Sequence, residues 1–274
     1  MKKYSFSYNT KELIPYIDWS YFYHAWGIGA KEQLNAKAQE VKKDAIALLN
    51  EHADNVGARA IFALCDAHSA GDSIMIEGTE LPLLRQQHSL PGEPNLCLSD
   101  FVSPQADKIG IFATSVGEVF ATNDNSDPYT ALLKQAVASR LAEAAATLLH
   151  MNVRRNKELW GYAPNETLTP QEMNAEKFQG IRPAIGYPSL PDQSVIFLID
   201  NLLHLRDAGI SITPNGAMIP HAAVCGLMIS HPAAHYFAVG PISNEQLLDY
   251  SKRRALKPEE LYKFLYKNIQ EQRF

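Results

Sequence analysis

The segment from Asp127 to about Arg155 constrains the fold of this chain more than any other. Apolar side chains recur along it at helical spacing, and Pro128 suits the first turn of a helix, where a missing N–H is tolerated. The apolar positions are Leu132, Leu133, Ala136, Leu141, Ala145, Leu148 and Leu149. So broad an apolar stripe is typical of a helix that buries one face in a protein core. We therefore expect one long helix, the strongest in the chain, packed against the core.

Short apolar runs of strand length lie before and after this helix. They are residues 60–65, 73–77, 96–102, 109–114, 222–230 and 236–239. Further helices are predicted over residues 30–53, after the capping-box sequence at 169–172, over 194–205, and in two C-terminal segments begun by Ser243 and Pro258. Strands and helices come in clusters without strict alternation, which favours an α+β fold with a mostly antiparallel sheet. We expect a single domain over residues 1–274, with an irregular lead-in over residues 1–13 that continues to about residue 17.

The charge and composition exclude several classes of protein. The formal net charge is -5 and the pI about 6.0, so a broad basic face for nucleic acid is not expected. No apolar stretch follows the basic start of the chain, and no run approaches the length of a membrane span, so we expect no secretory signal and a cytoplasmic protein. The cysteines Cys65, Cys97 and Cys225 are three in number and far apart, which favours buried thiols over disulfides or a zinc site.

Several motifs that carry chemistry are absent, and one that is present is misleading. The chain contains no glycine-rich phosphate loop, no H-E-x-x-H and no G-x-S-x-G. His221, His231 and His235 fall close together, but strand-end histidines are favoured over metal ligands. Residues 66–71 fit D-x-H-x-x-G, the signature of cobalamin-binding domains. Because Gly71 and Asp72 lead directly into another strand candidate, a hairpin turn is favoured over a cobalt ligand.

Six short motifs spread along the chain form the informative pattern. They are I-D-W-x-x-F-x-x-x-W at 17–26, C-L-x-D-F-V at 97–102, R-L-A-E-A at 140–144, W-G-Y-A-P-N-E at 160–166, Q-G-I-R-P-A-x-G-Y-P at 179–188, and S-H-P followed by Y-F-A-V within 230–239. In order and spacing this set resembles the activation (reactivation) domain of cobalamin-dependent methionine synthase. The resemblance covers residues 14–267, and the fourth and fifth motifs together make it highly specific.

The resemblance implies a single C-shaped domain, with flanking helices on a twisted sheet, that binds S-adenosylmethionine in a groove. The binding residues that carry over are Asp18, Glu143, Glu176, Arg182, Ala184, Gly186, Tyr187, Tyr236 and Phe237. No catalytic side chain and no metal ligand is implied, because cobalamin itself is the nucleophile in this family.

These residue types suit the ligand. An arginine fork binds both oxygens of a carboxylate, an aspartate suits an ammonium or a ribose hydroxyl, and glutamates stabilise a sulfonium. Aromatic rings can stack on adenine or approach the sulfonium. Taken without the resemblance, the same residues have ordinary explanations. Arg182 could form a surface ion pair, Glu143 could be a solvated helix residue, and Asp18 could be a helix cap.

The implied function is that of an activation subunit. It would support the reductive methylation of inactive cob(II)alamin to methylcobalamin on a separate cobalamin-binding methionine synthase chain. The electron would come from a flavodoxin-type or other low-potential donor, and the methyl group from S-adenosylmethionine. The match extends over nearly the full length, which leads us to expect a free-standing chain. Two alternatives stay open: a reactivator of another corrinoid methyltransferase, and a non-catalytic S-adenosylmethionine sensor.

Overall fold

A six-stranded antiparallel sheet forms the centre of the molecule in the computed structural model, which describes residues 1–121 and 127–269. Its strands run in the order β4 (Thr79–Pro82), β3 (Ser73–Ile76), β2 (Val56–Ala70), β5 (Asp107–Val116) and β8 (Ala223–Met228). The remaining strand, β1 (Lys2–Asn9), pairs with the first part of β2. Two short strands, β6 (Ser211–Ile212) and β7 (Met218–Ile219), form a separate ribbon. The α+β class with a mostly antiparallel sheet is confirmed.

Both faces of the sheet are covered, so the middle of β2 and most of β5 are buried on both sides. Along β2, Ala60 and Phe62 belong to the core on one face, while Ile61 and Ala63 belong to the core on the other. A strand buried on both faces appears in the sequence as a continuous apolar run. This is why residues 60–65 and 109–114 were recognisable as strands without clear alternation.

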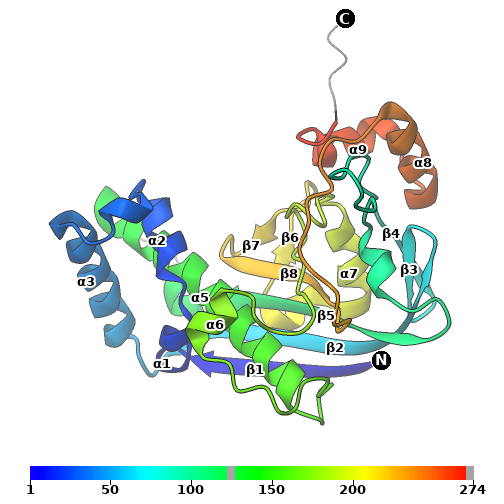
Figure 1. Cartoon of the computed structure of the whole chain (residues 1–274). Coiled ribbons are helices and arrows are strands. Elements are labelled where there is room, and N and C mark those ends of the chain that lie inside the picture. Colours follow the sequence, from blue (N-terminus) through cyan, green and yellow to red (C-terminus); the bar gives the residue numbers. More distant parts are fainter. Residues whose placement is uncertain (122–126, 270–274) are drawn as a thin grey trace, which may run out of the picture.

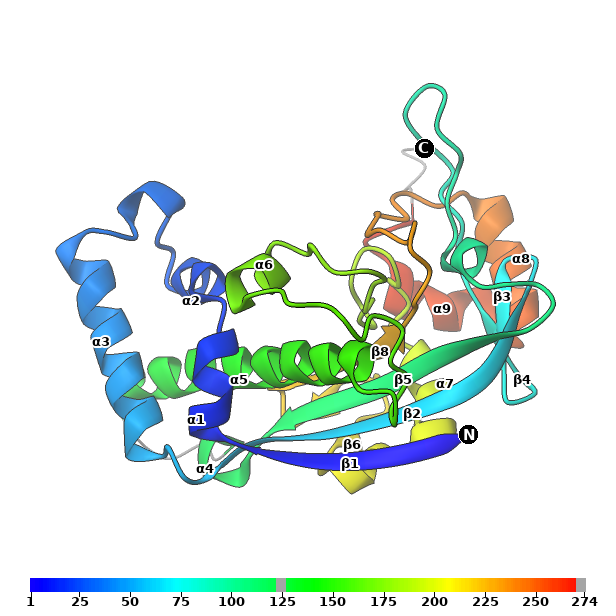
Figure 2. The ribbon, with the colours of Figure 1, turned by 60° about the horizontal axis from the view of Figure 1, so that its bottom comes forward.

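The long helix α5 (Pro128–Arg155) packs across one face of the sheet, as expected (Figures 1 and 2). Asp127 is its N-cap and accepts the amide hydrogens of Tyr129 and Thr130. The opposite face is covered by α7 (Val195–Leu203) and by two short 3-10 helices, η3 (Leu98–Phe101) and η4 (Leu205–Ala208).

The remaining helices lie at the two ends of the sheet. At one end are α1 (Thr10–Leu13), the 3-10 helices η1 (Ile14–Tyr16) and η2 (Ala30–Glu32), α2 (Trp19–Ala25), α3 (Ala36–Glu51) and α4 (Glu118–Ala121). At the other end, α8 (Asn244–Arg254) and α9 (Pro258–Leu265) enclose a small core of their own. Figure 1 shows α2 and α3 rising at one end of the sheet and α8 and α9 at the other, with α6 (Pro170–Asn174) between them, which gives the expected C shape.

The irregular lead-in predicted for residues 1–13 is wrong. Residues 2–9 form β1, which pairs with β2 from Lys2–Leu64 to Asn9–Val56, and α1 follows at once. Tyr4, Phe6 and Tyr8 alternate with polar residues and pack on the α5 side of the sheet. This period of two is the ordinary signal of a half-buried strand, and it was present in the sequence.

Two predictions of strands are also wrong. The run at 96–102 forms η3 instead, because Cys97 N–H bonds the Asp100 carboxylate at 2.8 Å and closes a tight turn. The run at 236–239 has no strand partner and is an irregular loop, fixed by the bond from Val239 N–H to Pro188 O at 2.9 Å. The predicted helix over 30–53 begins later, at Ala36, where the Asn35 side chain caps it.

The D-x-H-x-x-G segment forms a hairpin, as expected. Residues 66–70 are the end of β2, and Ala70 pairs with Ser73 across a turn in which Gly71 has φ 59°. All three cysteines are buried and reduced. In the described ranges, no cluster of three or more His, Cys, Asp or Glu residues is placed to hold a metal ion. Within the same ranges, every helix is too short or too polar to span a bilayer.

Candidate functional site

A pocket of about 500 Å³ opens between α5 and the loops that face it. Every site residue predicted from the sequence lines it except Gly186; these residues are Asp18, Glu143, Glu176, Arg182, Ala184, Tyr187, Tyr236 and Phe237. They come from the start of α2, the middle of α5, the loop after α6, the 182–188 loop and the 236–238 loop. The fold therefore brings together residues that are more than two hundred positions apart in the sequence, such as Asp18 and Phe237.

The polar centre of the pocket is a contact between Arg182 and α5. Arg182 Nη1 lies 3.5 Å from Glu143 Oε2, and Nη2 donates to Thr147 Oγ1 at 3.0 Å. Tyr187 OH donates to the other oxygen of Glu143 at 2.8 Å. Burial and the Glu143 carboxylate raise the pKa of Tyr187 to about 12, so its hydroxyl stays protonated as a donor. The Arg182 side chain is 20% exposed and that of Glu143 is 24% exposed, so both are accessible from the pocket.

The pocket wall also contains residues that were not predicted as site residues; four of them are Arg140, Thr147, Tyr21 and Phe178. Arg140, Glu143 and Thr147 lie on one face of α5, because residues three or four apart on a helix are neighbours. The Arg140 guanidinium lies 5.5 Å from the centre of the Tyr21 ring at the edge of the pocket. Arg140 and Thr147 lie three and four residues from Glu143, so helical spacing could have identified these two from the sequence.

The 182–188 loop owes its position to β8. Ile185 N–H bonds Cys225 O at 2.9 Å, and Leu227 N–H bonds Pro183 O at 3.0 Å, so the loop joins the edge of the sheet through the Ala184–Gly226 bridge. Gly226 permits this approach, because a Cβ at that position would lie 2.2 Å from Pro183 O.

Replacing Gly226 by alanine is therefore expected to lower the free energy of unfolding by about 1–3 kcal/mol, the usual cost of forced overpacking. Urea denaturation measures this. Gly29→Ala is the matched control, because a Cβ there meets only Glu32 Oε2 at an ordinary 3.6 Å. Equal unfolding midpoints for the two variants would contradict the proposed crowding at β8.

Gly186 supports the turn and does not line the pocket. Its φ is 83°, a conformation that favours glycine, and its N–H bonds Leu190 O at 2.8 Å. A Cβ there would lie 2.5 Å from Gln193 Oε1. Gly186 therefore has a structural role, since it turns the chain so that Tyr187 reaches Glu143 on α5, and its contact with a ligand stays a prediction.

Asp18 and Glu176 line the pocket from separate segments. The Asp18 carboxylate caps α2 by accepting Ser20 N–H at 2.8 Å, so the helix-cap explanation holds, and the residue lines the pocket as well. Glu176 follows α6 and has φ 55°, an uncommon conformation for a non-glycine residue. Burial raises the pKa of Glu176, and the opposing effect of Arg182 is smaller.

The 236–238 loop forms part of the pocket wall. Tyr236 OH accepts the N–H of Arg182 at 3.0 Å, so this ring also fixes the backbone of the arginine. The buried Ser189 hydroxyl donates to Phe237 O, and Ser189 Oγ in turn accepts the N–H of Phe237 at 3.3 Å. Both backbone groups of Phe237 are thus held by one serine.

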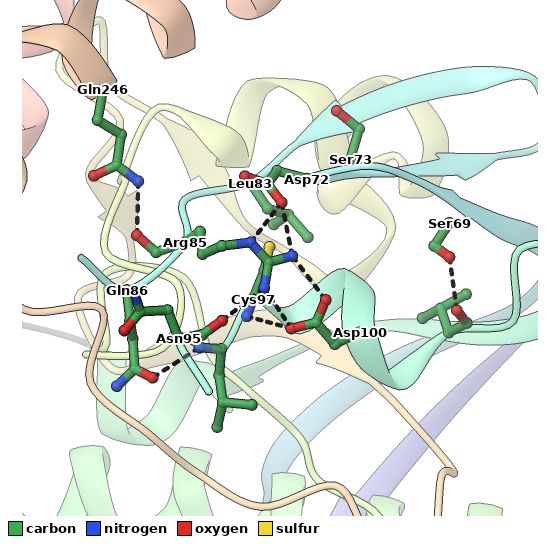
Figure 3. Close-up of polar contacts among 12 residues, drawn as sticks. Ser69, Asp72, Ser73, Leu83, Arg85, Gln86, Asn95, Cys97, Asp100 and Gln246 are labelled. Atoms are coloured by element: carbon green, nitrogen blue, oxygen red, sulfur yellow. Dashed lines mark hydrogen bonds and ion pairs between the residues drawn. The ribbon is translucent and has the colours of Figure 1, made fainter. Parts of the chain in front are cut away.

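A polar cluster outside the pocket supports the same wall. Figure 3 shows the Arg85 guanidinium between the carboxylates of Asp72 and Asp100, with which it forms contacts of 2.7 Å. Burial raises and Arg85 lowers the pKa of Asp100, and the net shift is downward. The next residue, Gln86, donates to Ala238 O at 2.9 Å. The motif at 97–102 therefore does not line the pocket itself. Its Asp100 holds Arg85, and the neighbouring Gln86 supports the 236–238 loop.

The motif at 160–166 also lies outside the pocket lining. Gly161 N–H bonds Val153 O at 2.9 Å and Ala163 N–H bonds Arg154 O at 2.8 Å, so the motif caps the C-terminus of α5. Glu166 binds Arg154 through two hydrogen bonds of 2.7 Å. The Arg154 guanidinium lies 4.4 Å from the centre of the Phe178 ring, which does line the pocket.

His150 is buried beside this cluster, and its Nε2 lies 2.9 Å from Tyr162 OH. Burial, followed by the charges of Arg154 and Arg182, holds its pKa well below the ordinary value. The folded protein thus keeps His150 neutral at a pH where the unfolded chain takes up a proton. The contribution of His150 to stability is complete above the unfolded pKa, about 6.5, and is lost as the pH falls below it.

We expect His150→Gln to reduce the loss of stability between pH 7.5 and 5.5 by about 1 kcal/mol relative to the unsubstituted chain. Denaturant unfolding at both pH values measures the difference. The control is His24→Gln, since His24 is exposed on α2. An acid-induced loss as large in His150→Gln as in the unsubstituted chain would show that His150 titrates normally.

These features define a class: an α+β domain with a pocket that is lined by arginines, carboxylates and aromatic rings. Comparison with known proteins places the chain within that class. Residues 9–255 match the family model of the vitamin B12 dependent methionine synthase, activation domain, and the chain belongs to this family. The crystal structure of the MetH reactivation domain bound to AdoHcy superimposes with a TM-score of 0.90 at 33% sequence identity. That comparison covers 99% of this chain and 91% of the other.

Proposed function

We propose that the pocket binds S-adenosylmethionine and presents its methyl group to a cobalamin held by a partner region. The observation that carries this proposal is the Arg182–Glu143 contact inside a pocket also lined by Asp18 and Glu176. A related domain, 33% identical, was crystallised with AdoHcy, the product that remains when S-adenosylmethionine gives up its methyl group.

The charges of the pocket match those of the ligand. S-adenosylmethionine carries a carboxylate, an ammonium and a sulfonium, a net charge of one positive unit. The side chains of Asp18, Glu143 and Glu176 outnumber those of Arg140 and Arg182 by one, which leaves one negative charge when all are ionised. Opposite charges attract more strongly in a pocket that excludes part of the water.

The individual roles follow from side-chain chemistry. Arg182 binds the carboxylate, because its planar fork matches two oxygens. Asp18 binds the ammonium or a ribose hydroxyl, and Glu143 and Glu176 stabilise the sulfonium. Tyr236 and Phe237 pack on the adenine or approach the sulfonium, while Ala184 lets the ligand lie close to the backbone. The chain supplies binding and orientation and needs no nucleophile of its own.

The reaction that this site serves is the reductive methylation of cob(II)alamin. One electron from a flavodoxin-type or other low-potential donor and one methyl group from S-adenosylmethionine give methylcobalamin and S-adenosylhomocysteine. Methyl transfer is the irreversible step and draws the unfavourable electron transfer forward. The domain contributes by holding the sulfonium where the cobalt of the partner can reach it.

Two measurements on the full chain test this proposal. Isothermal titration calorimetry with S-adenosylmethionine is expected to show saturable binding to one site per chain. A cobalamin-dependent methionine synthase chain that lacks its own activation domain is then mixed with this protein, S-adenosylmethionine and a reductant. The visible spectrum should convert from cob(II)alamin to methylcobalamin. The absence of binding heat would contradict the proposal at its first step.

The second measurement also separates the alternatives. Binding without any methyl transfer would favour a sensor of S-adenosylmethionine. Transfer to a different corrinoid protein, but not to the methionine synthase chain, would favour a reactivator of another methyltransferase. In both cases the pocket would still bind S-adenosylmethionine, but the proposed methionine synthase partner would be wrong.

A further inference from the structure

Two contacts of different length hold the Arg182 guanidinium on α5. Charge-assisted N–H···O bonds to carboxylates are usually about 2.7–2.9 Å long, so the distance of 3.5 Å to Glu143 is long for such a pair. The bond to Thr147 Oγ1, at 3.0 Å, has an ordinary hydrogen-bond length. The closer of the two contacts therefore goes to a hydroxyl group that was not among the residues predicted from the sequence.

The backbone of α5 fixes the direction of the Thr147 hydroxyl. Thr147 Oγ1 lies 3.1 Å from the carbonyl oxygen of Glu143, one turn earlier, and donates its single proton there. A hydroxyl has one donor and two lone pairs, so Thr147 can only accept from Arg182. Thr147 is buried, with 8% of the residue exposed, so water competes little for these lone pairs.

We propose that Thr147 is a positioning residue for the ligand carboxylate, acting through Arg182. It holds Nη2 against α5, so that the rest of the guanidinium fork stays directed at the pocket. Because Thr147 is neutral, it anchors the arginine without offsetting its positive charge, and that charge remains available to a carboxylate. Without this anchor the guanidinium is free to turn onto Glu143 and form a closer ion pair, which would compete with the ligand. This inference rests on the proposed binding of S-adenosylmethionine.

Thr147→Val is the sharpest test, because valine keeps the shape of the side chain and removes only the hydroxyl. The binding of S-adenosylmethionine to the full-length variant is measured by calorimetry. The same titration is made with decarboxylated S-adenosylmethionine, which has no carboxylate for Arg182 to bind. Thr147→Ser, which restores the hydroxyl, is the matched control.

The affinity of Thr147→Val for S-adenosylmethionine is expected to fall about tenfold, the usual effect of losing one hydrogen bond to a charged group. Its affinity for the decarboxylated compound should match that of the unsubstituted chain, and Thr147→Ser should recover most of the lost affinity. A purely structural role would weaken both ligands equally, and this result would overturn the inference. Unchanged affinity for S-adenosylmethionine in Thr147→Val would also overturn it. If the unsubstituted chain binds neither compound, the proposed function fails as well, which is a distinct outcome.

Discussion

Replacing Arg182 by alanine is expected to weaken the binding of S-adenosylmethionine by about a hundredfold or more. Truncating one member of a hydrogen-bonded charge pair costs about 2–5 kcal/mol, and each 1.4 kcal/mol is a tenfold change in affinity. Arg182 is 80% buried between α5 and the 236–238 loop, since its side chain is 20% exposed, so water replaces it poorly. Its loss also leaves Glu143 without the cation that lies 3.5 Å away. The ligand carboxylate would then enter a pocket dominated by negative charge.

Calorimetry with S-adenosylmethionine on Arg182→Ala and the unsubstituted chain measures this effect. Two further variants test whether the loss is specific to the guanidinium at this position. Arg206→Ala removes an equal charge from an exposed position on η4, on the far side of the sheet from α5, and should bind like the unsubstituted chain. Arg182→Lys keeps the charge but lacks the planar fork, so its affinity should be intermediate. Equal affinities for Arg182→Ala and the unsubstituted chain would remove Arg182 from the binding site.

The site was predictable to the extent that its residues fall within recognisable motifs. Asp18, Arg182 and Tyr187 were identified because each lies in a short pattern with a known order along the chain, and all three line the pocket. A motif does not reveal whether its side chains face a ligand or another part of the protein. The motif at 160–166 illustrates this limit, because its hydrogen bonds close the end of α5.

The incorrect strand predictions have a common physical cause. Apolar runs at 96–102 and 236–239 have the composition of strands, but contacts from distant segments decide their structure. Arg85 holds Asp100 in a tight turn, and Ser189 holds both backbone groups of Phe237. Local propensity is weaker than such tertiary contacts. Thr147 was missed for the opposite reason: it lies within a strong helix, and its partner Arg182 is thirty-five residues away in sequence.

The largest effect on stability is expected at the Arg154–Glu166 pair. Arg154 is 1% exposed and Glu166 is 8% exposed, and two hydrogen bonds of 2.7 Å join them. Glu166→Ala would leave the Arg154 charge buried without its partner, which typically costs about 3–5 kcal/mol. Urea denaturation measures this loss. The control is Asp54→Ala, whose pair with Lys11 is exposed and should contribute nothing measurable.

A double variant distinguishes the loss of the pair from the loss of packing. Replacing Arg154 by methionine and Glu166 by leucine removes both charges and keeps apolar bulk, so it should recover most of the stability lost in Glu166→Ala. The Arg154 guanidinium also lies 4.4 Å from the centre of the Phe178 ring, which lines the pocket. The double variant should therefore fold but bind S-adenosylmethionine less tightly, since Phe178 loses its support. If Glu166→Ala is as stable as Asp54→Ala, the buried pair does not stabilise the end of α5.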